Sequence, residues 1–221
     1  MPLSVDSKSL ADWLAPERTA LVVVDMQVDF ASKDGVLGRA GMDMSPADPA
    51  LAAAERLVAT ARAAGAPVIF VGLATTLATD SPVWSEWRRR VRGSGDAGLC
   101  RAGSRGAEFF GPTPELGETV VWKLRYSGFY GTSLDATLRA RRVDTLVVCG
   151  LTTECCVDCT VRDAFHRDYF VYVPDDACAA YDEGMHESTL KSLALNCATI
   201  VSTDDVVSAW GAGASRVRAM A

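Results

Sequence analysis

The sequence predicts an α/β protein of three layers, in which a doubly wound, mostly parallel sheet of six strands lies between layers of helices. Short runs rich in β-branched residues alternate with segments of helical period, which is typical of βαβ units. The run TALVVV at residues 19–24 is apolar throughout, as expected of a central strand buried on both faces. The 221 residues, 49% of them hydrophobic, suit one domain spanning residues 1–221.

The predicted strands are short runs rich in apolar, mostly β-branched or aromatic residues. Most of them end at a glycine, a proline or a charged residue, which are residues that interrupt a buried strand. In chain order these strands are residues 19–24, 68–71, 118–122, 146–149, 169–173 and 198–201.

The predicted helices lie between or beside these strands. Gly65 and Pro67 mark the end of the second helix, and Thr132 is a candidate cap for the third. The loop at residues 31–49 contains several glycines and prolines, and we expect a frayed tail of Gly, Ala and Arg after the last helix. In chain order the helices cover roughly residues 10–14, 50–64, 133–140, 155–167, 185–196 and 204–210.

The least regular part of the chain is residues 72–117, which are rich in Gly, Ser, Thr and Pro. A segment this long inside a compact domain is usually functional, so we predict a lid or insertion around residues 73–117. The alternative is a surface excursion pinned by Trp84 and Trp87. The arginine run at residues 88–90 is either a solvated helix face or a site for an acidic substrate or partner.

Charge and composition exclude several classes of function. The net charge of −6 and the pI near 5.0 do not favour nucleic acid or an anionic membrane surface as a partner. Residues 1–16 lack the apolar core of a signal peptide, and no run approaches a membrane span, so we expect a cytoplasmic protein. The seven cysteines are then reduced thiols, and the two histidines are too few for a multi-histidine zinc site.

Residues 146–165 form the stretch around which the chain is organised. An apolar strand is followed by Gly150 and two threonines, and then by a helical pattern that starts with Cys155 and Cys156. Backbone N–H groups at such a helix start can hold an oxyanion, and the helix dipole stabilises a thiolate. We therefore expect a cysteine nucleophile whose pKa is below the free value of about 8.5. The alternative is a buried structural cysteine.

Three ionisable residues follow predicted strands. Asp25 follows the first strand, Lys123 the third, and Cys156 the turn after the fourth. Ligands of open parallel sheets bind at the carboxyl ends of the strands, so these side chains converge if their strands are near neighbours. The carboxylate would then act as general base and the ammonium would favour a thiolate. Taken singly, Asp25 could cap a turn and Lys123 could be a surface residue.

Three motifs give the chain a resemblance to the isochorismatase-like cysteine hydrolases. The motifs are LVVVDMQVDF at residues 21–30, Lys123 within VVWKLRYSGFYGTSLD, and GLTTECCVDCTVRDA at residues 150–164. The last fits the family pattern G-x-x-T-x-x-C-V, which selects Cys156 over Cys155 as the nucleophile. The resemblance implies a catalytic triad of Asp25, Lys123 and Cys156, without a cofactor or a metal.

The resemblance implies further details of the turn and of the reaction. The family's cis peptide would lie between Leu151 and Thr152, and its oxyanion hole would be the backbone N–H groups of Thr152 and Cys156. The reaction would hydrolyse a C–N bond through a thioester on Cys156. Phe30, Tyr126 and Gln27 are candidates for substrate binding because each lies close in sequence to a triad member.

The complete triad favours a small amide, ureido or carbamoyl substrate. Parts of the chain resemble ureidoacrylate-type amidohydrolases and the biuret-hydrolase group, and members of the family are often homo-oligomers, so we expect a dimer or tetramer. One alternative is a vinyl-ether hydrolase of the isochorismatase type, which does not need a thiol. Another is a thiol redox protein that uses Cys155, Cys156 and Cys159, in which Asp25 and Lys123 would have no role.

Overall fold

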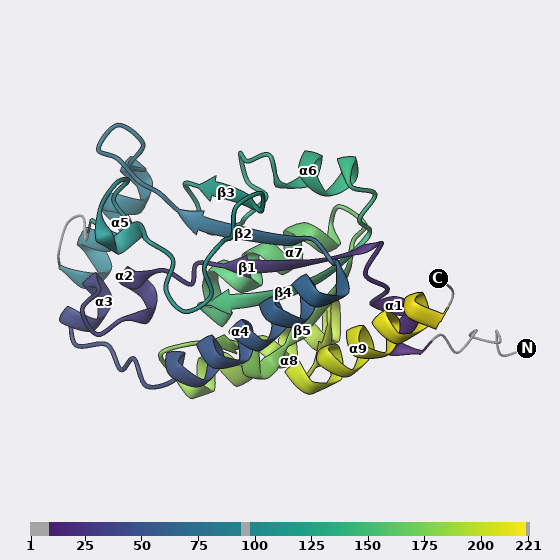
Figure 1. Ribbon diagram of the computed structural model, residues 1–221. Helices are drawn as coiled ribbons and strands as arrows, with labels where there is room; N and C mark the ends of the chain where they lie inside the picture. Colours follow the sequence, from purple (N-terminus) through teal and green to yellow (C-terminus); the bar gives the residue numbers. More distant parts are fainter. Residues whose placement is uncertain (1–8, 94–97, 220–221) are drawn as a thin grey trace, which may run out of the picture.

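The computed structural model describes residues 9–93 and 98–219, so residues 1–8 of the expected lead-in lie outside the described part. Its centre is a parallel sheet of seven strands with helices on both faces (Figure 1). The strands follow the order β3-β2-β1-β4-β5-β7, and the short β6 pairs with β4. Their bounds are Thr19–Val24 for β1, Val68–Leu73 for β2, Thr119–Lys123 for β3, Thr145–Leu151 for β4, Phe170–Pro174 for β5, Cys178–Ala179 for β6 and Thr199–Val201 for β7.

The helices cover the two faces of this sheet. In Figure 1, α4 and α9 lie in front of the sheet and α7 lies behind it. Their bounds are Leu10–Trp13 for α1, Val28–Ala31 for α2, Val36–Arg39 for α3, Ala47–Ala64 for α4, Pro82–Arg92 for α5, Leu134–Ala140 for α6, Asp158–Phe165 for α7, Glu183–Asn196 for α8 and Thr203–Ala219 for α9. Shorter helical turns are η1 at Arg105–Ala107, η2 at Thr153–Val157 and η3 at Asp175–Ala177.

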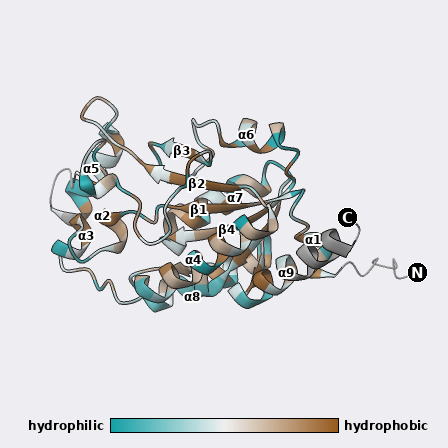
Figure 2. Cartoon of the chain, in the orientation of Figure 1, coloured by the Kyte–Doolittle hydropathy of each residue, from teal (hydrophilic) through white to brown (hydrophobic). Residues whose placement is uncertain are grey.

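The predicted doubly wound fold is confirmed, because all six predicted strands are present and pair in parallel. All residues of β1 and β4 are buried, as the uninterrupted apolar runs predict. Figure 2 shows hydrophobic residues concentrated along the central strands. On α4, Ala50, Leu57 and Ala61 belong to the buried stripe at helical spacing, and Gly65 ends the helix with φ of 76°.

Several elements differ from the prediction. Between residues 72 and 117 the prediction gave no helix bounds and offered a helix face only as one interpretation of the arginine run, whereas α5 forms there over Pro82–Arg92. Its signals are local: Ser81 accepts a hydrogen bond from the Trp84 N–H, Pro82 is the first helical residue, and Gly93 ends the helix in a left-handed conformation. Strand β6 was not predicted, because two residues are too few to show the alternating pattern of a strand. The prediction of a frayed tail after residue 210 is wrong, because α9 continues to Ala219. The segment contains Ala and Arg, which favour helix.

The centre of the sheet fixes the position of the site. Val24 pairs with Gly150 where β1 and β4 run side by side. A Cβ atom at Gly150 would lie 2.0 Å from the Val24 carbonyl oxygen, and the φ of Gly150 is 140°, so glycine is required. The order of the strands changes direction between β1 and β4, and in such sheets ligands bind outside the carboxyl ends at this point.

Candidate active site

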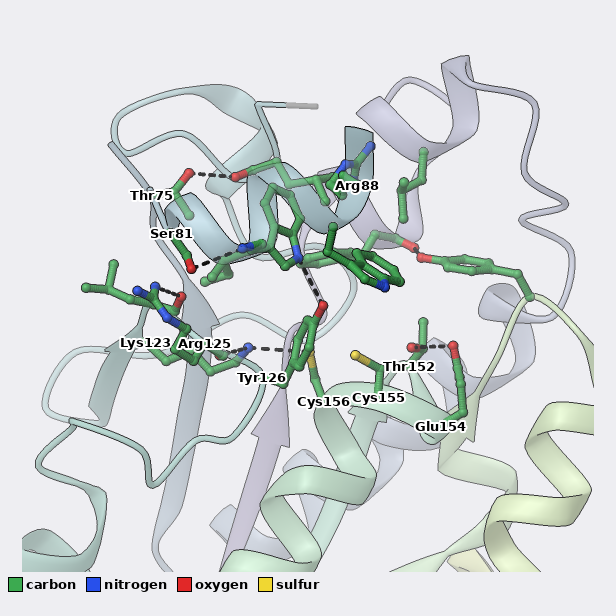
Figure 3. Close-up of a pocket in the computed structure, with 18 of the residues that line it drawn as sticks. Thr75, Ser81, Arg88, Lys123, Arg125, Tyr126, Thr152, Glu154, Cys155 and Cys156 are labelled. Carbon is green, nitrogen blue, oxygen red and sulfur yellow. Dashed lines mark hydrogen bonds between the residues drawn. The ribbon is translucent and has the colours of Figure 1, made fainter. Parts of the chain in front are cut away.

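Three ionisable side chains meet at the carboxyl ends of the strands. Asp25 follows β1, Lys123 ends β3, and Cys156 lies in η2 directly after β4. The Lys123 Nζ is 2.7 Å from Asp25 Oδ2 and 3.5 Å from Cys156 Sγ. Asp25 is 0% exposed, Lys123 1% and Cys156 7%. The structure therefore brings the three sequence-predicted residues into one buried group, and Figure 3 shows Lys123 and Cys156 at the cavity beside it.

Lys123 reaches this group across an intervening strand. β2 lies between β1 and β3, so Asp25 and Lys123 do not come from neighbouring strands. The Asp25 N–H donates to the Val71 carbonyl at 2.8 Å, which fixes Asp25 at the end of β2. On the other side of β2, Leu73 is in register with Lys123. The long lysine side chain then bridges the remaining gap.

The ion pair sets the charge state of the group. Burial raises the pKa of Asp25 above its ordinary value of 3.8, and the Lys123 ammonium opposes this effect only in part. Burial alone would lower the pKa of Lys123, but the Asp25 carboxylate and the Cys156 sulfur outweigh it, so the pKa of Lys123 is raised. The Lys123 Nζ also donates to the Arg125 carbonyl at 3.0 Å. Lys123 therefore stays charged at neutral pH.

The Cys156 thiol lies in a single turn of π-helix, where it is protonated at neutral pH. Its contact with the Cys155 side chain, its burial and the Asp25 carboxylate all raise the pKa of Cys156 well above the ordinary value of 9.0, and Lys123 only partly offsets them. The predicted lowering of this pKa is therefore wrong. The prediction considered only the helix start after β4, whereas the opposing carboxylate comes from another strand.

The raised pKa of Cys156 predicts an unusual pH dependence for its alkylation. The rate of Cys156 modification by iodoacetamide should rise about tenfold per pH unit through pH ~9 without levelling off, because only the thiolate reacts. Fragment-ion mass spectrometry would separate Cys156 from Cys155 and Cys159. N-acetylcysteine, run in parallel, should level off near its pKa of about 8.5. A plateau for Cys156 below pH ~8 would contradict the buried, protonated thiol.

The turn that carries Cys156 starts with a cis peptide bond between Leu151 and Thr152. The Thr152 carbonyl accepts hydrogen bonds from the N–H groups of Cys155 and Val157, at 3.1 and 3.2 Å. The Thr152 Oγ1 donates to Glu154 Oε1 at 2.9 Å. Thr152 and Cys156 both line the cavity (Figure 3), so the two residues predicted for the oxyanion hole lie at its wall.

A cavity of about 610 Å³ opens beside the thiol, and most of its wall is apolar. Phe30 and Tyr126 line it, as two of the three substrate-binding predictions require. Gln27 does not line it. The Gln27 amide is fully buried: its Nε2 donates to the carbonyls of Leu73 and Ala107, and its Oε1 accepts from the Leu73 N–H. Gln27 thus ties the end of β2 to η1.

Sequence reasoning missed several residues of the cavity wall. Trp84 on α5 donates its indole N–H to the Tyr126 hydroxyl at 2.9 Å, which joins the segment after β2 to the loop after β3. The Tyr181 hydroxyl donates to the Phe30 carbonyl at 2.6 Å. Tyr181 also lines the cavity, although it does not lie near a triad member in the sequence. Arg88 lines it too, and it belongs to the arginine run that the sequence offered as a candidate site for an acidic substrate. The sequence analysis considered Trp84 only as a residue that would hold a surface loop against the protein.

The seven cysteines are all free. Cys155 and Cys156 line the cavity, whereas Cys159 does not. Within residues 9–93 and 98–219, no three His, Cys, Asp or Glu side chains come together in a way that could hold a metal ion. None of the helices in this part of the chain is long and apolar enough to cross a membrane.

Comparison with known proteins places this fold among the hydrolases. The isochorismatase domain family matches residues 19–205. Ureidoacrylate amidohydrolase RutB of Methylobacterium radiotolerans is 42% identical over 192 residues, which cover 81% of this chain and 74% of that protein. The RutB protein of Pseudomonas syringae pv. syringae is 40% identical over 176 residues, covering 74% of this chain and 71% of its own length.

Two solved structures extend the comparison. A cysteine hydrolase from Pseudomonas syringae pv. phaseolicola has a TM-score of 0.80 and 28% identity, and the match covers 94% of this chain and 99% of that one. N-carbamoylsarcosine amidase from Thermoplasma acidophilum has a TM-score of 0.67 and 32% identity, covering 85% and 97%. The protein is thus a hydrolase of the doubly wound α/β class. It belongs to the isochorismatase family.

Proposed function

We propose that the protein is a cysteine-dependent amidohydrolase that cleaves a C–N bond of a small ureido, carbamoyl or related amide compound. The observation that carries this proposal is the buried Asp25–Lys123–Cys156 group, in which one ammonium contacts both the carboxylate and the sulfur. Two kinds of relative support the same class of substrate: the ureidoacrylate amidohydrolases and N-carbamoylsarcosine amidase.

In the proposed first step, Asp25 accepts the thiol proton while the Cys156 sulfur attacks the carbonyl carbon of the substrate. The backbone N–H groups of Thr152 and Cys156 stabilise the resulting oxyanion. When the C–N bond breaks, Asp25 returns the proton to the leaving nitrogen, and an acyl or carbamoyl thioester remains on Cys156. The raised pKa values of Asp25 and Cys156 suit this transfer, because the base and the thiol hold a single proton between them.

In the proposed second step, water attacks the thioester carbon and Asp25 accepts a proton from that water. The tetrahedral intermediate then expels the Cys156 sulfur, which regains its proton. Lys123 remains charged throughout. Its role is to hold the Asp25 carboxylate in place and to stabilise negative charge as it moves between oxygen and sulfur.

Ammonia release from a panel of small compounds tests this function. The panel comprises ureidoacrylate, N-carbamoylsarcosine, maleamate, biuret and nicotinamide. We expect one of the first four to be turned over, and Cys156→Ser to reduce that turnover by about 10³-fold or more. Cys159→Ser is the matched control, since this thiol does not line the cavity. Turnover that survives Cys156→Ser would overturn the proposed mechanism.

The predicted cytoplasmic location and homo-oligomeric state stay predictions. One observation favours assembly: Val83, Trp87 and Val91 recur at helical spacing along α5 and are 80%, 47% and 62% exposed. Such a stripe is apolar surface that a second subunit could cover.

A further inference from the structure

Thr160 lies on α7 one helical turn after Cys156, and its hydroxyl group joins two segments of the site. The Thr160 Oγ1 donates to the Cys156 carbonyl oxygen at 2.6 Å. The same oxygen accepts a hydrogen bond from the Gly128 N–H at 2.9 Å. Thr160 is 0% exposed and does not line the cavity. This hydroxyl group therefore links the turn that carries Cys156 to the loop after β3 without reaching the substrate.

The loop after β3 is also held by the lysine of the buried group. The Lys123 Nζ donates to the Arg125 carbonyl at 3.0 Å and lies 3.5 Å from the Cys156 Sγ. Three residues further along the loop, the Gly128 N–H donates to Thr160. These contacts form a closed ring that runs from the ammonium through the loop and the Thr160 hydroxyl to Cys156, and from its sulfur back to the ammonium. A change at any member of the ring alters the distance between sulfur and ammonium.

A second link between the same loop and α7 does not involve Cys156. The Ser127 Oγ donates to the Asp163 Oδ2 at 2.5 Å, and Asp163 also pairs with Arg167 at 3.3 Å. This link holds the loop against the helix, but it ends on side chains of α7. The two links can therefore be broken separately, one at the backbone of Cys156 and the other away from it.

We propose that Thr160 is a positioning residue that holds the Cys156 sulfur at its distance from the Lys123 ammonium. This inference rests on the proposed function and adds to it a residue outside the cavity wall. Attack on a carbonyl carbon depends closely on the position of the nucleophile, and a displacement of about 1 Å can reduce the rate about 100-fold. A threonine hydroxyl that bonds to the carbonyl four residues earlier often bends a helix, which suits the change from the π-helical turn η2 to α7.

The variants Thr160→Ala and Thr160→Ser test the hydroxyl group itself, because both lack the threonine methyl group and only the serine keeps the hydroxyl. The substrate is the compound of the ammonia-release panel that is turned over. Thr160→Ala should lower kcat by about 10–100-fold and change KM less than about threefold, since Thr160 does not line the cavity. Thr160→Ser should keep kcat within about threefold of the wild-type value.

Two control variants separate positioning from a general loss of stability. Thr60→Ala removes the same kind of bond on α4, where the Thr60 Oγ1 donates to the Arg56 carbonyl four residues earlier at 2.8 Å. Ser127→Ala removes the other link between the loop and α7. Each should change kcat less than about threefold, and urea unfolding reports the stability of each variant. The inference would be overturned by an equal loss of kcat in Ser127→Ala, by a Thr160→Ser protein as slow as Thr160→Ala, or by a Thr160→Ala protein that does not fold.

Alkylation of Cys156 tests the inference without turnover. At pH ~8, iodoacetamide should modify Cys156 at least about threefold more slowly in Thr160→Ala than in Thr160→Ser, because a sulfur displaced from Lys123 loses the neighbour that favours its thiolate. An equal rate, or the faster rate of a turn that has merely loosened and exposed the sulfur, would overturn the positioning role. If no compound of the panel is hydrolysed and the slower alkylation is found, the proposed function fails and the positioning role stands. If turnover occurs and Thr160→Ala keeps the kcat of Thr160→Ser, the reverse holds.

Discussion

Lys123→Met should abolish turnover and lower the free energy of unfolding by about 3–5 kcal/mol. The substitution leaves the fully buried Asp25 carboxylate without its ammonium partner at 2.7 Å. With Lys123 absent, burial acts on Asp25 unopposed by that charge, and the pKa of Asp25 rises further. The carboxyl group is then protonated in the folded protein near neutral pH, so it cannot accept the thiol proton.

Urea unfolding at two pH values and ammonia release measure this result. The pKa of Asp25 is raised in the folded protein, so this group contributes stability below its unfolded pKa, and that contribution is lost as the pH rises. The loss of unfolding free energy caused by Lys123→Met should therefore be smaller at pH ~4 than at pH ~7. Lys191→Met removes a lysine that is 77% exposed and paired with Glu187, and should cost less than about 0.5 kcal/mol. A Lys123→Met protein as stable as wild type at neutral pH would contradict the proposed ion pair.

A double variant separates stability from catalysis. Asp25→Leu combined with Lys123→Met removes both charges from the buried site, so it should recover much of the stability that Lys123→Met alone loses. It should not recover turnover, because neither the base nor the ammonium is present. Recovery of both would mean that the pair has a purely structural role.

The fold could be predicted because its strands are local features. The run TALVVV needs no distant contact to be recognised as a buried strand, and Asp25 and Lys123 directly follow or end such runs. Since the carboxyl ends of parallel strands share one edge of the sheet, strand ends alone indicated where the site lies. Helix α5 was predictable in principle from Ser81, Pro82 and Gly93, which mark its two ends.

Much of the cavity wall could not be predicted, because it depends on contacts between distant segments. Tyr126 meets Trp84 through a hydrogen bond between residues that are 42 positions apart, and Tyr181 meets Phe30 across 151 positions. No local pattern distinguishes Arg88 from Arg89, although one is buried and the other exposed. The pKa of Cys156 was misjudged in part for the same reason. Its largest cause, the contact with the adjacent Cys155 side chain, is local, but burial and the Asp25 carboxylate, which also raise this pKa, depend on the fold.

Asp25→Asn should change turnover and thiol reactivity in opposite directions. The amide has nearly the shape of the carboxylate but cannot accept the thiol proton, so turnover should fall by about 10³–10⁴-fold. The Asp25 charge is one of the causes that raise the pKa of Cys156. Its removal leaves Lys123 beside the sulfur without an opposing carboxylate, so the pKa of Cys156 should fall and alkylation by iodoacetamide at pH ~8 should become faster.

Ammonia release and site-resolved alkylation, measured on the same preparation, check this pair of effects. Asp34→Asn is the control, because Asp34 is 75% exposed at its side chain and lies away from the thiol. In wild-type protein, turnover should decline as pH falls through the pKa of Asp25, which lies above 3.8, since protonation removes the base. If Asp25→Asn slowed both reactions equally, Asp25 would only position Cys156. Faster alkylation with lost turnover is the result that a general base requires, because the thiolate then forms more readily and yet the proton has no route to the leaving nitrogen.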